Sequence, residues 1–410
     1  MILILFTTSY PYITGGEQNF IEMEAAYLLD SFERVIIVPE KRAGAREDFP
    51  PRLELVDSYA GFLQSHGRFS RFFSGLFSGL VYREIIRRPE VLIKPPFLKR
   101  LIFAAGHAEL TNRWLVRWMR EQGIRAGDCL FYTYWFNEVP LGLGLARRIW
   151  PELRLVSRAH GYDLYEEVNR PPYWPCRESA LNSVDAVFSV SLKGAEYLRQ
   201  KYPGYESKIR TARLGLSSPR ILAQSSSDHI YRIVSCSKLV PVKRVQLIMQ
   251  GITAAAARRP SQEFEWCHLG VGPLRQELEA ALSLMPVNVT ACFAGYSGQA
   301  DVFRYYRDHP VDVFINTSAS EGTPVAIMEA ISCGIPVIAT AVGGNAEIVS
   351  EKNGHLLPAS PTPEQVADAL LSHWDEPAQR RAGSLEVWAQ NYDATLNYSD
   401  FVKRLVEIRA

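Results

Sequence analysis

Short runs of β-branched and other apolar residues recur along the chain, and each is followed by a stretch whose apolar residues have helical spacing. In the first half these runs cover residues 2–7, 35–39, 130–134, 153–158 and 186–191. In the second half they cover residues 232–237, 265–269, 289–293, 313–317 and 336–340. Alternating strands and helices of this kind favour parallel sheets with helices on both faces. We therefore predict an α/β protein with two doubly wound, Rossmann-like sheets.

The boundary between the two predicted sheets lies in residues 216–228, a Ser- and Pro-rich stretch without periodicity that is typical of a linker. It separates an N-terminal domain, residues 1–215, from a C-terminal domain, residues 229–385. The last segment, residues 386–410, has helical apolar spacing near its end, and we expect it to pack back on the N-terminal domain. Ligands of doubly wound sheets bind beyond the carboxyl ends of the strands. We expect the two sheets to face each other across one ligand-binding cleft.

The composition argues against two classes of protein, nucleic-acid binders and membrane-spanning proteins. The 410 residues include 45 Lys and Arg against 44 Asp and Glu, and this balance argues against a dedicated nucleic-acid binder. Residues 322–345 contain a single charge, Glu329, but their Pro and Gly residues divide them into helix, turn, strand and turn. A buried βαβ unit therefore explains their apolarity better than a membrane span does.

The six cysteines indicate a reducing compartment. They lie at least 25 residues apart, so zinc knuckles and C-x-x-C redox motifs are excluded. The N-terminus lacks the basic region of a signal peptide. We expect a cytoplasmic protein.

A polar loop within residues 316–330 predicts an anion-binding helix N-terminus. A strand ends near Thr317, and the loop after it presents Glu321. Thr323 and Pro324 then predict a helix cap and a first helical residue. The free N–H groups and positive dipole end of such a helix suit a diphosphate. A solvated loop acid remains the alternative for Glu321.

Glu329 lies on an otherwise apolar face of the same predicted helix. Burying a carboxylate is costly unless it is hydrogen-bonded, and two ribose hydroxyls could supply the donors. A capping or core-network carboxylate is the alternative. The chain has no Asp-x-Asp pair, and a metal clamp on a diphosphate usually needs neighbouring carboxylates. We therefore expect a site without a metal ion.

Two lysines, Lys238 and Lys243, follow the first strand of the second half. Their ammonium groups can clamp a diphosphate and stabilise the charge of a leaving group, although solvated loop charges are the alternative. Gly270 and Gly272 follow the next strand, but Arg275 replaces the third glycine of a dinucleotide fingerprint. This departure disfavours a nicotinamide oxidoreductase and predicts a tight turn that leaves room for a base or ribose.

The first half offers three further candidates. Gly15 and Gly16 follow the first strand, where adjacent glycines let the backbone approach a ligand, or form a plain loop. The aromatic residues within 132–136 end a later strand and can stack on sugar faces or pack under a loop. His160 ends the next strand, where it can position a hydroxyl group or serve as a structural histidine.

Residues 321–340 read EGTPVAIMEAISCGIPVIAT, with Glu321 and Glu329 in an E-x7-E spacing. This stretch resembles the donor-site signature of retaining glycosyltransferase family 4, whose members have the GT-B fold. Residues 343–349 and 353–354 continue the likeness, residues 237–243 are similar to the family's R-L-x-x-x-K segment, and residues 270–274 to its glycine turn. The resemblance is specific over 231–358 and weaker over 1–215.

The resemblance implies a UDP- or GDP-sugar donor bound mainly by the C-terminal domain and an acceptor bound by the N-terminal domain. Its implied site residues are Lys238 and Lys243 for the diphosphate, Glu329 for ribose, Glu321 for the sugar hydroxyls, the backbone through Gly322, Thr323, Pro324 and Val325, the turn of Gly270 and Gly272, Gly15 and Gly16 near the phosphates, and His160 near the reacting centre. Two positions depart from the family pattern. Lys238 replaces an arginine, and Arg244 replaces a glycine and could add a contact to phosphate or acceptor.

The implied activity is that of a retaining hexosyltransferase without metal or other cofactor, of the kind that assembles lipopolysaccharide or capsule. The sugar would pass to a glycan or lipid-diphosphate-linked acceptor, and the leaving phosphate would take the acceptor proton. Two alternatives remain. One is a GT-B-like nucleotide-sugar epimerase, and the other is a non-catalytic glycan-binding subunit.

A basic and aromatic segment lies near residues 66–105. Residues 62–105 carry eight basic residues, two acidic residues and several phenylalanines at helical spacing. Such a stretch suits an anionic membrane surface or a lipid-diphosphate acceptor, and a solvated helix that covers the first sheet is the alternative. We expect the protein to be peripheral on the inner membrane leaflet.

Overall fold

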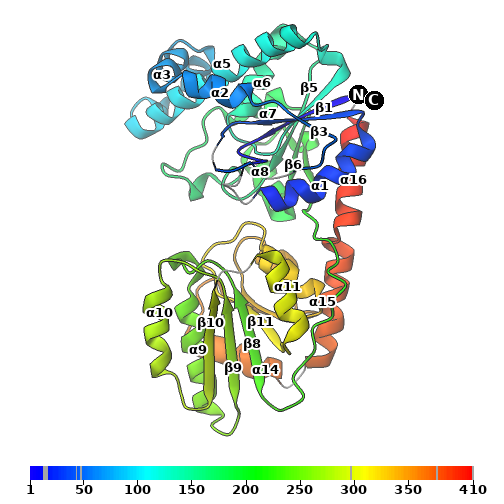
Figure 1. The fold of residues 1–410 in the computed structure, drawn as a ribbon. Coiled ribbons are helices and arrows are strands. Elements are labelled where there is room, and N and C mark those ends of the chain that lie inside the picture. Colours follow the sequence, from blue (N-terminus) through cyan, green and yellow to red (C-terminus); the bar gives the residue numbers. More distant parts are fainter. Residues whose placement is uncertain (13–16, 43, 47–48, 296–297, 375–376, 409–410) are drawn as a thin grey trace. The chain divides into compact units, whose positions relative to one another are not determined.

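The computed structural model describes residues 1–12, 17–42, 44–46, 49–295, 298–374 and 377–408. The chain forms two compact units: unit 1 comprises Met1–Leu214 and Leu396–Ala410, and unit 2 comprises Gly215–Thr395. Each unit contains one parallel sheet with helices packed against it (Figure 1).

The sheet of unit 1 has seven strands in the order β3-β2-β1-β4-β5-β6-β7. Every pairing is parallel, and Ile4 in the central strand lies opposite Ile36 on one side and Phe131 on the other. Continuous burial along these strands is expected where helices cover both faces of a parallel sheet. The strands are β1 (Ile2–Thr7), β2 (Arg34–Pro39), β3 (Leu53–Leu55), β4 (Cys129–Thr133), β5 (Arg154–Ala159), β6 (Ala186–Ser189) and β7 (Ile209–Thr211).

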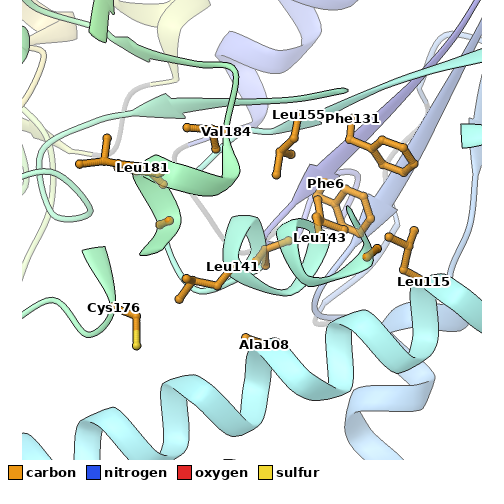
Figure 2. Close-up of a cluster of buried hydrophobic side chains, with 14 of the residues drawn as sticks. Phe6, Ala108, Leu115, Phe131, Leu141, Leu143, Leu155, Cys176, Leu181 and Val184 are labelled. Atoms are coloured by element: carbon orange, nitrogen blue, oxygen red, sulfur yellow. The ribbon is translucent and has the colours of Figure 1, made fainter. Parts of the chain in front are cut away.

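The helices of unit 1 build a deep core beside this sheet. They are α1 (Gln18–Ser31), α2 (Ser58–Ser65), α3 (Arg68–Leu76), α4 (Gly79–Arg87), α5 (Pro95–Gln122), α6 (Val139–Leu145), α7 (Arg177–Ser183) and α8 (Leu192–Lys201). Figure 2 shows side chains of α6 between Phe6 and Phe131 of the sheet and Ala108 and Leu115 of α5. The last helix, α16 (Ala394–Glu407), adds Phe401, whose ring contacts the ring of Tyr132.

The sheet of unit 2 has six parallel strands in the order β10-β9-β8-β11-β12-β13. The strands are β8 (Tyr231–Cys236), β9 (Phe264–Leu269), β10 (Val289–Gly295), β11 (Val313–Asn316), β12 (Val337–Thr340) and β13 (Gly354–Leu357). The helices are α9 (Val245–Arg258), α10 (Arg275–Ala281), α11 (Gln299–Asp308), α12 (Val325–Ser332), α13 (Asn345–Ile348), α14 (Pro363–Trp374) and α15 (Pro377–Asn391). Strands β8 and β11 are neighbours, so the loops that follow them leave the same edge of the sheet.

The predicted α/β class with two parallel sheets is confirmed, and all ten predicted strands occur with ends within two residues of the prediction. The three further strands, β3, β7 and β13, lie at sheet edges. Residues 216–228, predicted as a linker, belong to unit 2, where Ala223 N–H donates to the Cys333 carbonyl and Val311 N–H to that of Gln224.

Candidate functional site

The loops after β8 and β11 are joined by hydrogen bonds at the carboxyl edge of the sheet in unit 2. The loop after β8 includes a short 3-10 helix, Pro241–Lys243. Ala319 N–H donates to the Val242 carbonyl at 2.8 Å, and Thr317 Oγ1 donates to the Arg244 carbonyl at 3.0 Å. The side chains carried by the two loops therefore have fixed relative positions.

Lys243 and Glu321 form an ion pair between these loops. The Lys243 Nζ lies 2.6 Å from Glu321 Oε1, and this oxygen also accepts from Ser318 Oγ at 2.6 Å and from Asn316 Nδ2 at 3.1 Å. The Glu321 side chain is 9% exposed. A carboxylate held this way orients the ammonium group, whose other N–H bonds remain available to an anion. Lys238 is exposed and pairs with no carboxylate in the described part of the chain.

Arg244 holds the two loops together. Its backbone is left-handed, with φ 48°. The guanidinium donates from Nε to the Thr317 carbonyl at 2.7 Å, and from Nη2 to the carbonyls of Ser318 and Ala359 at 2.8 Å each. The sequence suggested a contact to phosphate or acceptor for this side chain, whereas the structure commits these N–H groups to the chain's own carbonyls.

Helix α12 begins at Val325, one residue later than predicted. Thr323 does not cap it, and Pro324, with ψ 86°, occupies the cap position outside the helix. Proline has no N–H group, so it donates no hydrogen bond to a ligand. Within the described residues the N–H groups of Gly322, Thr323 and Val325 have no acceptor. These three amides form a candidate anion site beside Lys243.

The glycine pair after β12 supports this amide cluster. Gly344 N–H donates to the Gly322 carbonyl at 3.1 Å. A Cβ atom on Gly343 would lie 1.8 Å from the carbonyl oxygen of Glu321, so only glycine fits there.

Glu329 lies one turn inside α12 and is 6% exposed. Its Oε1 accepts a hydrogen bond from Gln299 Nε2 at 3.0 Å, its one donor among the described residues. Burial raises the pKa of this carboxyl from its ordinary value of 4.5 to about 7. A carboxyl with so few donors has capacity for further ones, as two ribose hydroxyls would supply.

Gly270 and Gly272 pack against the loop that carries Lys238. A Cβ atom at Gly270 would lie 2.0 Å from the Ser237 carbonyl oxygen, and one at Gly272 would lie 2.4 Å from that of Leu239. Buried His268 also holds this loop, because its Nε2–H donates to the Ser237 carbonyl at 3.0 Å. Burial lowers the pKa of His268 to about 4, which keeps the ring neutral.

His160 directly follows β5 in unit 1 and lies against two aromatic rings. The centroid of its ring is 4.8 Å from that of Tyr134 and 4.3 Å from that of Trp135. The backbone N–H of His160 donates to Asp163 Oδ1 at 2.7 Å. Both ring nitrogens are buried without a hydrogen-bond partner among the described residues, and Nδ1 lies 3.8 Å from Asp163 Oδ2. The predicted candidates Gly15 and Gly16 lie outside the described residues.

The carboxylate of Glu17 connects two loops in unit 1 near His160. The sequence did not single out this residue. Its Oε1 accepts from the N–H groups of Ser9 at 2.6 Å and Tyr10 at 2.9 Å, and its Oε2 accepts from Trp135 Nε1 at 2.5 Å. The carboxylate thereby joins the loop after β1 to the loop after β4. The signal available in the sequence was an acidic residue directly after a glycine pair.

Part of unit 2 is similar to a known protein family. Residues 231–376 match the family described as "Glycosyl transferases group 1". Over this segment the chain is similar to group 1 glycosyltransferases. A relative in Streptococcus agalactiae, the UDP-N-acetylglucosamine–peptide N-acetylglucosaminyltransferase GtfA subunit, is 24% identical over 208 residues, which are 49% of this chain and 40% of that protein.

Two further similarities cover different lengths of the chain. The amylovoran biosynthesis glycosyltransferase AmsK of Erwinia amylovora is 26% identical over 163 residues, 37% of this chain and 38% of that protein. The chain thus spans less than half the length of these two curated relatives. The apo structure of the lipopolysaccharide outer core galactosyltransferase WaaB superposes with a TM-score of 0.73 at 13% identity, covering 100% of both chains. This likeness shows that the fold is of the GT-B type.

Unit 2 carries cationic side chains and backbone N–H donors on the loops that follow two neighbouring strands, β8 and β11. Lysine ammonium groups and free backbone amides are the groups that bind phosphate oxygens. Among the described residues, no group of three or more His, Cys, Asp and Glu side chains is arranged to hold a metal ion. In the same part of the chain, no helix combines the length and the apolar character that crossing a membrane requires.

Proposed function

We propose that the protein is a retaining hexosyltransferase that moves a sugar from a nucleotide-diphosphate sugar to a glycan or lipid-diphosphate-linked acceptor in surface polysaccharide biosynthesis. One observation carries the proposal: Lys243 and Glu321 form an ion pair between the loops that follow β8 and β11, and the second loop continues into three amides without an acceptor among the described residues. The group 1 glycosyltransferase match over the same residues supports it.

Each group of the donor site has a distinct role in this proposal. Lys243, with Lys238 beside it, binds the diphosphate, and the amides of Gly322 and Thr323 add hydrogen bonds. Glu329 accepts from the ribose hydroxyls, since it is buried with a single donor in the described part of the chain. Glu321 accepts from hydroxyls of the transferred sugar through the oxygen that Lys243 does not occupy. Lysines and amides neutralise the diphosphate, so we propose that no metal ion is needed.

The reaction we propose leaves the anomeric configuration unchanged. The bond between the anomeric carbon and the phosphate oxygen breaks, and the acceptor oxygen bonds to the same face of that carbon. The acceptor's proton passes to the departing phosphate oxygen. Because negative charge grows on the diphosphate, its stabilisation by Lys243 and the amides is the principal contribution of the chain. We assign the acceptor to unit 1, where His160 has two ring nitrogens to offer a hydroxyl group.

The test is turnover of UDP- and GDP-hexoses by the full chain in EDTA, followed by NMR of the released or transferred sugar. We expect nucleotide release with retained configuration and at least a hundredfold loss of rate in Lys243→Ala. Arg258→Ala is the matched control, because this arginine lies at the other end of α9 and pairs with Asp368. Isomerised donor, inverted product or full activity in Lys243→Ala would each contradict the proposal.

We also propose that unit 1 docks on an anionic membrane surface through helices α3 and α4 and the turn after them. Large apolar side chains are exposed to solvent in these elements: Phe69 is 83% exposed, Phe77 76%, Ile86 81% and Ile93 79%. Exposed Arg68, Arg83 and Arg87 lie among them. Apolar groups for the acyl boundary and cations for lipid phosphates are the two parts of an interfacial site.

The surface helices are rigidly attached to the unit. Helix α3 packs closely on α5 at Gly75, since a Cβ atom there would lie 1.8 Å from the Ile102 carbonyl oxygen and 2.9 Å from the Gly106 nitrogen. Cosedimentation with phosphatidylglycerol vesicles tests the docking. Phe69→Ser with Phe77→Ser should reduce binding at least tenfold. Equal binding by this variant, or equal binding to uncharged phosphatidylcholine vesicles, would refute an anionic docking surface.

A further inference from the structure

The outer edge of β7 in unit 1 is covered by arginine side chains instead of another strand. This strand ends the sheet, so its outward carbonyls have no strand partner. Arg199 of α8 donates from Nη2 to the Ile209 carbonyl at 2.6 Å, and Arg404 of α16 donates from Nη1 to the Thr211 carbonyl at 2.9 Å. Two guanidinium groups are thereby anchored along the edge, each with further N–H donors.

A cavity of about 430 Å³ lies beside this edge. Its lining includes Arg199, Arg404, the two further arginines Arg210 and Arg213, and one acidic residue, Asp400. Asp400 is paired with Arg404 at 2.7 Å. Within the described residues the other three arginines have no carboxylate partner. The cavity therefore holds three uncompensated positive charges.

The two further arginines are not needed to hold the edge strand. The Nε of Arg213 is buried and has no hydrogen-bond partner among the described residues. Arg210 lies with its guanidinium carbon 6.0 Å from the centre of the Phe188 ring. Arg213 also lines the cavity, so a bound anion there can pair with its charge.

The backbone beside the cavity is fixed from the opposite side. Arg158 donates from Nη2 to the carbonyls of Ala212 at 3.1 Å and Arg213 at 3.2 Å, and it forms a fully buried ion pair with Glu24. Asn397 of α16 donates to the Leu214 carbonyl at 2.9 Å. The cationic wall is thus built on a rigid frame, which reduces the ordering cost of binding.

We propose that this cavity is a binding site for a phosphate-bearing polyanion, such as a diphosphate or a sugar phosphate. Guanidinium forks match phosphate oxygens in pairs, and three uncompensated charges require more than one negative charge in the ligand. The volume lies within the range of small-molecule sites. The site belongs to unit 1, whereas the candidate donor site belongs to unit 2, so it does not depend on the proposed function.

Calorimetric titration of the full chain with inorganic pyrophosphate tests the site. The double variant Arg210→Gln with Arg213→Gln should bind at least tenfold more weakly than wild type. Arg113→Gln, an exposed arginine on α5, is the matched control for loss of charge. Lys243→Gln separates this cavity from the donor site and should leave this binding unchanged.

Three outcomes would overturn the proposal: no binding by wild type, binding that Lys243→Gln abolishes and the double variant retains, or equal weakening by Arg113→Gln. If the double variant fails to fold, hydrogen exchange of the wild-type chain with and without pyrophosphate tests the site. Pyrophosphate should then protect residues 209–213 and 397–404, and an absence of protection there would overturn the site. A sugar phosphate that binds more tightly than pyrophosphate indicates a phosphate carried on a glycan, and the reverse order indicates a free diphosphate.

Discussion

Replacing Glu329 with glutamine should remove a pH-dependent loss of stability from unit 2. The carboxyl is buried, and burial raises its pKa from 4.5 to about 7. Glutamine has nearly the same shape and keeps an oxygen for the hydrogen bond from Gln299. It cannot ionise, so the variant isolates the effect of the charge.

The direction in which stability changes with pH follows from the raised pKa of Glu329 in the folded protein. Between pH 4.5 and pH 7 the folded protein holds the Glu329 proton and the unfolded chain releases it, so folding is favoured most at low pH. The stabilisation is complete below pH 4.5 and is lost as pH rises through 7. A shift from 4.5 to about 7 corresponds to about 3 kcal/mol in total, of which about 2–3 kcal/mol is lost between pH 5 and pH 8.

The measurement is urea unfolding of the full chain at pH 5 and pH 8, with peptide-level hydrogen exchange to assign the transition of unit 2. The free energy of unfolding of Glu329→Gln relative to wild type should rise by about 2–3 kcal/mol from pH 5 to pH 8. Glu277→Gln removes an exposed carboxyl from α10 and should show no such rise. A difference between Glu329→Gln and wild type that is the same at both pH values would refute the reasoning.

The same carboxyl should link nucleotide binding to pH. Ribose hydroxyls would donate to the ionised form, so binding near pH 6.5 should release a proton and strengthen as pH rises. Glu329→Ala should weaken UDP or GDP binding by about 1–3 kcal/mol in calorimetry, the scale for lost hydrogen bonds to a charged group. Unchanged affinity would contradict the ribose role and leave the stability prediction intact.

Substitutions at three further positions test the loops of both units. Glu321→Gln should lower kcat at least tenfold with little change in nucleotide affinity in calorimetry, because Lys243, the proposed diphosphate ligand, remains. Arg244→Ala should lower the free energy of unfolding by about 1–3 kcal/mol through three carbonyls left without their donor, and Arg244→Gly by about 1 kcal/mol less, since glycine accepts the left-handed backbone. Glu17→Gln should lower the melting temperature of unit 1 in differential scanning calorimetry, because the N–H groups of Ser9 and Tyr10 lose a charged acceptor.

The positions of ten strands could be predicted because each of these strands has a local sequence pattern of its own. A run such as residues 313–317 is apolar, β-branched and bounded by polar residues, which suffices for a buried parallel strand. Strands β3, β7 and β13 have three or four residues and one neighbour each, so their sequences carry too little pattern. Each of these short strands is positioned by pairing with the neighbouring strand of the sheet.

The site was predictable only as separate pieces. The motifs place Lys243 and Glu321 on loops after strands, but the ion pair joins residues 78 positions apart and exists because β8 and β11 are neighbours. The residues around Lys243 and Glu321 do not predict that these two strands are adjacent in the sheet. The buried pair of Arg158 and Glu24 in unit 1, 134 positions apart, was missed for the same reason.

Arg244 shows how a departure from a family pattern can be structural. The side chain stands where the resembled family has glycine, and its φ of 48° explains why glycine suits the position. An arginine in this strained backbone is retained because three carbonyls accept its N–H groups. Two of those carbonyls belong to the loop that leads to Glu321, while Lys243 directly precedes Arg244 in the chain. The guanidinium therefore sets the separation of the ammonium and carboxylate groups, and we class Arg244 as a positioning residue for both.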